Sequence, residues 1–208
     1  MKRLSGITIG LLVIGFTVFG CAQMSSMIDT GWVTLIDGEK GLENFNRIGD
    51  ANWRAEGGAI VADKGTGNAN HLVSMKSYKD FQIRAEFWAD HNTNSGIFIR
   101  ASDPKNIGAK NAYEVNIYDM RAGPEYSTGA IVNFAKVPVP PVYKAGGKWN
   151  TFLITAKGPN LIVEFNSLQT VNINHDQFKE GPFTLQFGNH GKEPGGAIKW
   201  RKVQVKEL

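Results

Sequence analysis

Alternation of apolar and polar residues is the feature that most constrains the fold of this chain. From Phe81 to Ala89 every odd-numbered residue is apolar, and Gln82, Arg84 and Glu86 stand between them. Successive side chains of a β-strand point to opposite faces, so this segment predicts a strand with one buried and one solvated face. After residue 30 no window shows the i, i+3, i+4, i+7 spacing of an amphipathic helix. The body of the chain is therefore expected to be β-structure.

Shorter segments of strand character recur along the chain. Turn residues separate them, such as the pair Gly57-Gly58 and the run Lys157-Gly-Pro-Asn160. Many short strands divided by turns are typical of an all-β sandwich or barrel, and the size of the folded part favours a two-sheet antiparallel jelly roll. The further predicted strands are Trp32–Ile36, Trp53–Ala55, Ala59–Ala62, His71–Ser74, Ser95–Arg100, Ala112–Tyr118, Gly129–Phe134, Thr151–Ala156, Leu161–Phe165, Gln169–Ile173, Phe183–Phe187 and Ala197–Val205.

Composition and charge exclude several classes of function. Hydrophobic residues make up 42% and charged residues 20%, which is enough apolar side chain for a packed core. The formal net charge of +4 is too small to indicate nucleic-acid binding. The single cysteine, Cys21, excludes a disulfide framework within one chain. The sequence has no G-x-S-x-G, P-loop or G-x-G-x-x-G motif, which argues against serine hydrolases, NTPases and dinucleotide-binding enzymes.

Residues 1–20 have the pattern of an export signal. Lys2 and Arg3 precede the almost wholly apolar run Ile7–Phe19. A helix over that run would be only about 20 Å long. This is short of the ~30 Å hydrocarbon layer of a membrane, so a cleaved signal is expected rather than a permanent span.

Cys21 stands where a bacterial lipoprotein signal requires a cysteine, because Val18-Phe-Gly-Cys21 resembles a lipobox. An ordinary secretory signal with a chance cysteine is the alternative. With two or more acyl chains Cys21 would give lasting membrane attachment. We expect a signal peptide over 1–20, a tether over 21–30 and a folded domain over 31–208. The protein would be exported and membrane-anchored, periplasmic or on the cell surface, and at the outer membrane in a Gram-negative cell.

Two predicted strands place polar and aromatic side chains on one outer surface. Phe98 and Arg100 lie opposite the aliphatic residues of one strand, and Glu114, Asn116 and Tyr118 do the same on the next. A carboxylate, an amide, a guanidinium and aromatic rings on one face suit a sugar, which needs planar polar partners and stacking surfaces. A surface ion pair between neighbouring strands is the alternative interpretation.

Histidine and carboxylate spacing gives fewer signals. His190 follows a predicted strand, where it could act as a general base, bind a metal, or have no role. His71, His91 and His175 lack metal-ligand spacing and receive no role. Asp119 is an odd number of residues from Glu114, so the strand does not predict the paired carboxylates of a retaining glucanase.

Several motifs follow one another in an order that resembles a known family. They are Trp32-Val-Thr-Leu-Ile-Asp-Gly38, Trp53-Arg-Ala-Glu-Gly-Gly58, Tyr78-Lys-Asp-Phe81, Asn94-Ser-Gly-Ile-Phe-Ile-Arg100, Tyr113-Glu-Val-Asn-Ile-Tyr-Asp119, Thr128-Gly129, Trp149-Asn150, Leu185-Gln186 and His190-Gly191. Together they resemble the 3-keto-disaccharide hydrolase domain family (DUF1080) over nearly all of residues 31–208. The resemblance implies a concanavalin-like lectin/glucanase jelly roll. Asn116 departs from it, since the family usually has glutamine there, and so does the stretched loop before His190.

The resemblance implies a substrate that is a glucoside or disaccharide already oxidised at C3. Removal of the C2 proton would give an enolate, the C1 substituent would leave, and water addition would complete a net hydrolysis. Glu114 would be the base. Arg100 or a bound divalent cation, calcium or another, would hold the enolate, with His190 assisting. The residues that would bind the sugar are Asn94, Phe98, Asn116, Tyr118 and Gln186.

Two other readings of the same chain stay open. A lectin-like lipoprotein could bind carbohydrate on this face without any chemistry. A structural or interaction lipoprotein could use the sandwich as a scaffold, in which case the polar face would carry no pocket. The expected partners are a carbohydrate and, through Cys21, a membrane.

Overall fold

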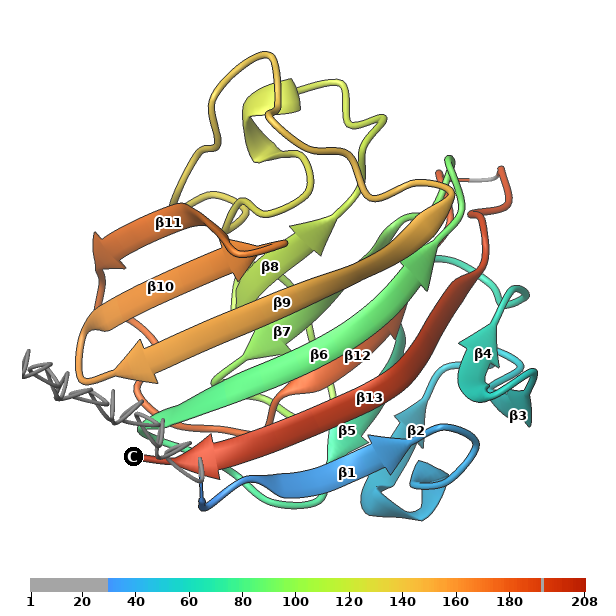
Figure 1. Cartoon of the computed structure of the whole chain (residues 1–208), viewed down its shortest axis with the longest axis horizontal. Helices are drawn as coiled ribbons and strands as arrows, with labels where there is room; N and C mark the ends of the chain where they lie inside the picture. The colour runs from blue at the N-terminus through green and yellow to red at the C-terminus, as the bar shows by residue number, and fades with distance from the viewer. Residues whose placement is uncertain (1–29, 192) are drawn as a thin grey trace, which may run out of the picture. The chain divides into compact units, whose positions relative to one another are not determined.

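The computed structural model describes residues 30–191 and 193–208, and within them Gly31–Leu208 forms one compact unit. The predicted all-β sandwich is confirmed, with two antiparallel sheets (Figure 1). The elements are β1 (Val33–Asp37), η1 (Leu42–Asn44), β2 (Phe45–Ile48), β3 (Arg54–Glu56), β4 (Ala59–Ala62), β5 (Asn70–Ser74), β6 (Phe81–Ala89), β7 (Ser95–Ile99), β8 (Tyr113–Ile117), η2 (Pro124–Tyr126), β9 (Lys148–Lys157), β10 (Asn160–Phe165), β11 (Leu168–Asn174), β12 (Thr184–Phe187) and β13 (Ile198–Glu207).

The two sheets differ in size. The larger sheet, here sheet A, has eight strands in the order β11-β10-β9-β6-β13-β4-β3, with β1 also pairing β13. The smaller sheet, sheet B, has five strands in the order β2-β5-β12-β7-β8. Figure 1 shows sheet A in front of sheet B. In this part of the chain no helix is long and apolar enough to span a membrane. The predicted signal peptide and Cys21 lie outside the described residues.

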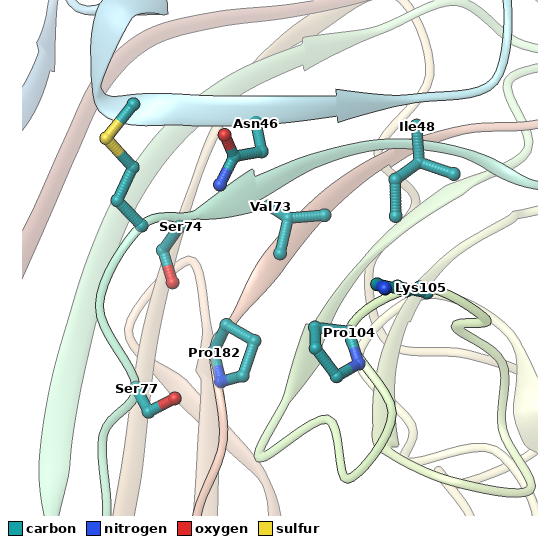
Figure 2. A pocket seen from close by; sticks show the side chains of 9 residues that line it. Asn46, Ile48, Val73, Ser74, Ser77, Pro104, Lys105 and Pro182 are labelled. Carbon is teal, nitrogen blue, oxygen red and sulfur yellow. The ribbon is translucent and has the colours of Figure 1, made fainter.

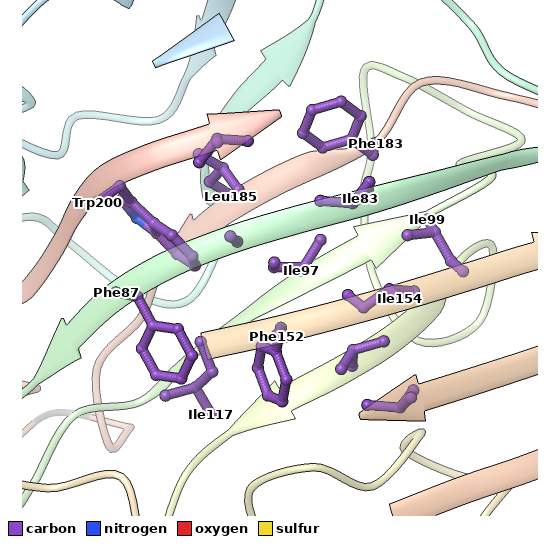
Figure 3. Close-up of a cluster of buried hydrophobic side chains, with 14 of the residues drawn as sticks. Ile83, Phe87, Ile97, Ile99, Ile117, Phe152, Ile154, Phe183, Leu185 and Trp200 are labelled. Carbon is purple, nitrogen blue, oxygen red and sulfur yellow. The ribbon is translucent and has the colours of Figure 1, made fainter. Parts of the chain in front are cut away.

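The core lies between the two sheets. Sheet A contributes Phe87, Phe152 and Trp200, whose rings pack with centroids 5.0 Å (Phe87 to Phe152) and 5.7 Å (Phe87 to Trp200) apart. Sheet B contributes aliphatic residues such as Ile97 and Leu185, which are fully buried (Figure 3). The alternation predicted for β6 is borne out, because its odd-numbered residues are all buried.

Two strand predictions need correction. Gly129–Phe134 is not a strand: it makes isolated bridges, Val115 to Ile131 and Ile131 to Ala135, beside β8. The turn that closes through Ile131 prevents a continuous ladder. Conversely, β2 was not predicted, because the segment Phe45-Asn-Arg-Ile48 is short and half polar.

We expect the buried Trp200 to be a major source of stability. Trp200→Ala should lower the free energy of unfolding by about 3–5 kcal/mol through lost burial and a cavity. Trp149→Ala is the matched control, since Trp149 is 37% exposed on the outward face of sheet A. Urea denaturation followed by circular dichroism measures both. Similar losses for the two variants would contradict this assignment of the core.

Candidate functional site

Strand β8 places Glu114 on the outward face of sheet B. Tyr113, Val115 and Ile117 point into the core and are buried. Glu114 and Asn116, between them, must then face outward. The sequence prediction for this strand is therefore correct in which side chains share a face.

A row of side chains crosses the outward face of sheet B at the level of Glu114. The strand registers pair Asn46 with Val73, Val73 with Thr184, Thr184 with Phe98, and Phe98 with Glu114. Neighbouring strands are about 4.8 Å apart, so this row extends for roughly 19 Å. Val73, Thr184 and Phe98, in the middle of the row, are buried, so solvent reaches the row only at its Asn46 and Glu114 ends.

Glu114 combines burial with the absence of a hydrogen-bond partner for its carboxylate within the described residues. Burial raises the pKa of Glu114 to about 7, and the nearby positive charge of Arg121 lowers it in part. Gly96 makes room beside it, because a Cβ there would lie 3.0 Å from the Val115 carbonyl oxygen and 3.5 Å from Glu114 Cγ. A half-buried carboxyl with a pKa near neutrality has the properties of a general base.

Arg121 was not singled out by the sequence. It lies in the turn after β8, between Tyr118 and η2, where no periodicity predicts the direction of a side chain. Its charge acts on Glu114 without an ion pair within 4.0 Å in the described residues. Arg121 is therefore the cation that the structure brings to the predicted base.

A second row lies next to the first and holds three buried polar atoms without partners in the described residues. Gln186 is paired in register with His71, and Asn116 with Gly96. The unpartnered atoms are His71 Nε2, Gln186 Oε1 and Asn116 Oδ1. Leaving a buried polar atom unpaired costs about 1–3 kcal/mol. Because three such atoms lie on one face, this face is a candidate binding surface.

The other atoms of these three residues are held in place. Asn116 Nδ2 donates to the Tyr126 carbonyl at 2.6 Å, and Gln186 Nε2 to the Asn68 carbonyl at 2.9 Å. His71 Nδ1 lies 3.0 Å from Thr184 Oγ1. Burial lowers the pKa of His71 to about 4, so its ring is neutral near pH 7. Spacing along the chain predicted no role for His71, because its neighbours on this face come from other strands.

His190 and Tyr118 meet at the end of this face. His190 Nε2 lies 2.5 Å from the Asn92 carbonyl oxygen, which only accepts, so Nε2 carries the proton. His190 Nδ1 then accepts from the Tyr118 hydroxyl at 2.8 Å. Asn94 is tied to the same loop through Nδ2, which donates to the Asn189 carbonyl at 2.8 Å. Both ring nitrogens of His190 are occupied, so the histidine orients Tyr118 rather than presenting a free base.

The segment 101–112 covers part of the outward face. Phe98 is 2% exposed and packs with Ala101, Ala112 and Ile107. The residue predicted to stack on a sugar is thus covered by the chain itself. Its ring meets that of His71 edge to face at 5.1 Å.

A pocket of about 380 Å³ lies on the same face, on the side of Phe98 away from Glu114. Asn46 and Ile48 from β2 and Val73 from β5 form one wall, and Pro104 and Lys105 of segment 101–112 the other (Figure 2). Neither Glu114 nor Asn116 lines this pocket, so it lies beside the proposed site and does not include it.

The placement predicted for Arg100 is wrong. Arg100 has a φ of 53°, which ends the strand alternation at β7, and it is 1% exposed. Its guanidinium donates to the carbonyls of Lys79 at 2.8 Å and Gly158 at 2.8 Å and pairs with Asp80 at 3.2 Å. It ties loops together and does not join Glu114 on the outward face.

Comparison with known proteins identifies the family. A model of the 3-keto-alpha-glucoside-1,2-lyase-like domain matches residues 31–206. The chain belongs to the 3-keto-alpha-glucoside-1,2-lyase-like domain family. The resemblance seen in the motifs is therefore confirmed, and family membership supports a carbohydrate-related function. No curated protein matches the sequence.

Solved structures support the fold of this 3-keto-alpha-glucoside-1,2-lyase-like domain. A candidate glycosyl hydrolase from Parabacteroides distasonis ATCC 8503 is 22% identical, with a TM-score of 0.70 over 86% of this chain and 100% of that one. The carbohydrate-binding module CBM66 from Bacillus subtilis is 17% identical, with a TM-score of 0.56 over 86% and 96%. The lumenal domain of VIP36, in its Ca²⁺- and mannose-bound form, is 8% identical, with a TM-score of 0.58 over 84% and 89%.

The predicted divalent cation has no evident ligand set in this lyase-like domain. Within residues 30–191 and 193–208, no three His, Cys, Asp or Glu side chains lie together as metal ligands would. Calcium takes six to eight oxygen ligands, whereas Glu114 is the one carboxylate in the two rows described above.

Glu114 should make the stability of the domain depend on pH. Burial raises its pKa above the unfolded value of 4.5 to about 7. The folded state then holds the proton more tightly, so its contribution to stability is complete below pH 4.5 and is lost as the pH rises to about 7. Glu114→Gln should remove this part of the pH dependence. Urea denaturation of both proteins between pH 4 and 8 measures it, and parallel curves would contradict the prediction.

Proposed function

We propose that this domain cleaves the glycosidic bond of 3-keto-glucosides or 3-keto-disaccharides on the outward face of sheet B. Glu114 is the base that removes the C2 proton. The observation that carries the proposal is its half-buried carboxyl, with a pKa raised to about 7 and no hydrogen-bond partner in the described residues. Family membership supports the substrate class.

The chemistry needs one base and one group that stabilises negative charge. The ketone at C3 acidifies the C2 proton, which passes to the Glu114 carboxylate while the electron pair moves to the C3 oxygen. The enolate then expels the C1 substituent, whose oxygen takes up a proton and leaves as an alcohol. Water adds across the resulting C1–C2 double bond, so the sum is hydrolysis. General-base catalysis of this kind contributes about 10²–10⁴-fold.

Arg121 replaces Arg100 as the group that holds the enolate. A guanidinium stays charged at all working pH values and donates in a planar fork that fits an oxyanion. Arg121 is close enough for its charge to act on Glu114. A cation beside the base favours both the ionised base and the enolate that forms next to it.

Tyr118 lies four residues beyond Glu114, roughly 13 Å away along the strand direction. This matches the second unit of a disaccharide or the aglycone of a glucoside. The Tyr118 hydroxyl donates its hydrogen bond to His190, so its oxygen can accept a hydrogen bond from a sugar hydroxyl. Asn94, Asn116 and Gln186 form the polar framework around the two positions.

Sugar binding without chemistry is the second proposal. Both ring nitrogens of His190 are already bonded, which removes one of the predicted acid–base groups and favours a lectin-like role. The polar face would then bind carbohydrate, with Glu114 only accepting hydrogen bonds. Turnover separates the two functions.

We expect release of the aglycone from a chromogenic 3-keto-glucoside but not from the plain glucoside, since only the ketone acidifies C2. Glu114→Gln should reduce kcat at least 10²-fold and leave the protein folded. The kcat/KM of the parent should rise with pH through about 7 as Glu114 ionises. Glu180→Gln, in an exposed loop, is the matched control.

Full activity of Glu114→Gln would disprove the role of Glu114. Binding of sugar without release from either substrate would support the lectin-like function. A parallel assay with a chelator tests the predicted divalent cation, since loss of activity with chelator and recovery with calcium would show that a cation takes part in the reaction.

We also propose that Cys21 carries a lipid anchor that holds the domain at a membrane. The support is the lipobox-like sequence Val18-Phe-Gly-Cys21 after a basic and then an apolar segment. Cys21→Ala should move the protein from the membrane fraction of a bacterial host to the soluble exported fraction. Metabolic labelling with a fatty acid should mark the parent and not the variant, and equal labelling would contradict the anchor.

A further inference from the structure

The outward face of sheet A, opposite the proposed site, carries three tryptophans and many cations. Trp88 and Trp149 face outward from β6 and β9, and Trp32 precedes β1 at the edge of the same sheet. Figure 1 looks onto this face, with β9, β6 and β13 across its middle. None of these residues takes part in the proposed reaction.

The strand registers bring the tryptophans and cations together. Lys199 on β13 pairs with Trp88 on β6, and Trp88 pairs with Trp149 on β9. The ladder is irregular between Trp200 and Lys202, and Arg201, which lies between them, is exposed. From there Arg201 reaches Glu86 at 2.6 Å.

Each tryptophan ring has a cation over it. The Lys199 ammonium lies 4.7 Å from the Trp88 ring centre, and the Arg201 guanidinium 4.3 Å from that of Trp149. Arg84 lies 4.2 Å from the centre of Trp32. Such stacking holds the long side chains over the sheet.

Positive charge dominates the middle of this face. On the outward positions of β6, β9 and β13, Glu86 is the one carboxylate, and Asp37 and Glu164 lie on the strands beside them. The cations on the outward side of those three strands are Arg84, Lys157, Lys199, Arg201, Lys202 and Lys206.

We propose that the outward face of sheet A docks on an anionic phospholipid surface. Tryptophan favours the boundary between water and lipid, and lysine and arginine near an anionic bilayer are attracted to its headgroups. The cation-rich face has the complementary charge to phosphate headgroups, and the Lys199 ammonium over Trp88 can donate to phosphate oxygens.

The proposal deepens the membrane attachment proposed above but does not require acylation. Docking through sheet A would also set the orientation of the domain on the membrane. Because sheets A and B face opposite sides of the core, docking through sheet A leaves Glu114 facing away from the membrane. Soluble substrates would then reach the site while the domain rests on the bilayer.

The test uses the chain from Ala22, which keeps the compact unit Gly31–Leu208 and lacks the acylation site. Co-sedimentation is measured with vesicles of phosphatidylcholine alone and with vesicles containing phosphatidylglycerol. We expect binding only to the anionic vesicles, weakened by salt. The variant with Lys199, Lys202 and Lys206 changed to glutamine should bind more than ten-fold more weakly, at about five-fold for each charge removed.

The matched control changes Lys64, Lys144 and Lys179, which are exposed lysines in loops, to glutamine and should bind as the parent does. Trp149→Ala is a second test that leaves the charge unchanged and should also weaken binding. Equal losses in the two triple variants, or equal binding to both kinds of vesicle, would overturn the proposal. So would a dimer in vesicle-free solution that the first triple variant dissociates, because the face would then join two copies. Turnover of a soluble 3-keto-glucoside should be the same in both triple variants, which separates this proposal from that for Glu114.

Discussion

Packing between the two sheets determines which side chains reach the outer faces, and the proposed site depends on it. Tyr113, Val115 and Ile117 fill the core from β8, so Glu114 has no other direction than outward. A shift of one residue in the register of β8 would exchange these sets and bury the carboxylate in the apolar layer. The core therefore holds the strand in register, and with it the position of Glu114 above Gly96.

Two carboxylates close in sequence show the difference between a structural and a functional acid. Asp119 accepts from Thr128 Oγ1 at 2.6 Å, from the backbone N–H of Ala145 at 3.1 Å and from that of Gly146 at 2.9 Å. It ties three segments together, and both of its oxygens already accept hydrogen bonds from the protein. Glu114 has no such donors in the described residues although it is half-buried, so its ionisation costs stability. This loss of stability does not help the fold. It is expected where a reaction needs a proton acceptor near neutral pH.

Alternation of apolar and polar residues predicts the direction of side chains only where the strand is regular. It placed Glu114 and Asn116 correctly because β8 is regular from Tyr113 to Ile117. It failed for Arg100, whose positive φ turns the chain at the end of β7. His71 and Arg121 could not be found this way, because their proximity to the site comes from strand pairing and from a turn. The positions of these two residues depend on contacts between segments that are distant in sequence, which alternation within one strand does not predict.

The two outer faces of the sandwich can have different electrostatic properties because the core separates them. Stacked sheets are about 10 Å apart, and exposed charges on their outer sides are farther apart than the Debye length of about 8 Å at physiological salt. The cations of sheet A are therefore poorly placed to stabilise the Glu114 carboxylate, and the nearby positive charge of Arg121 is the one that lowers its pKa. A basic face for a lipid surface and a base poised near pH 7 are thus compatible in one small domain. Neutralisation of the sheet A lysines by phosphate headgroups would leave the ionisation of Glu114, and so the chemistry proposed for it, essentially unchanged.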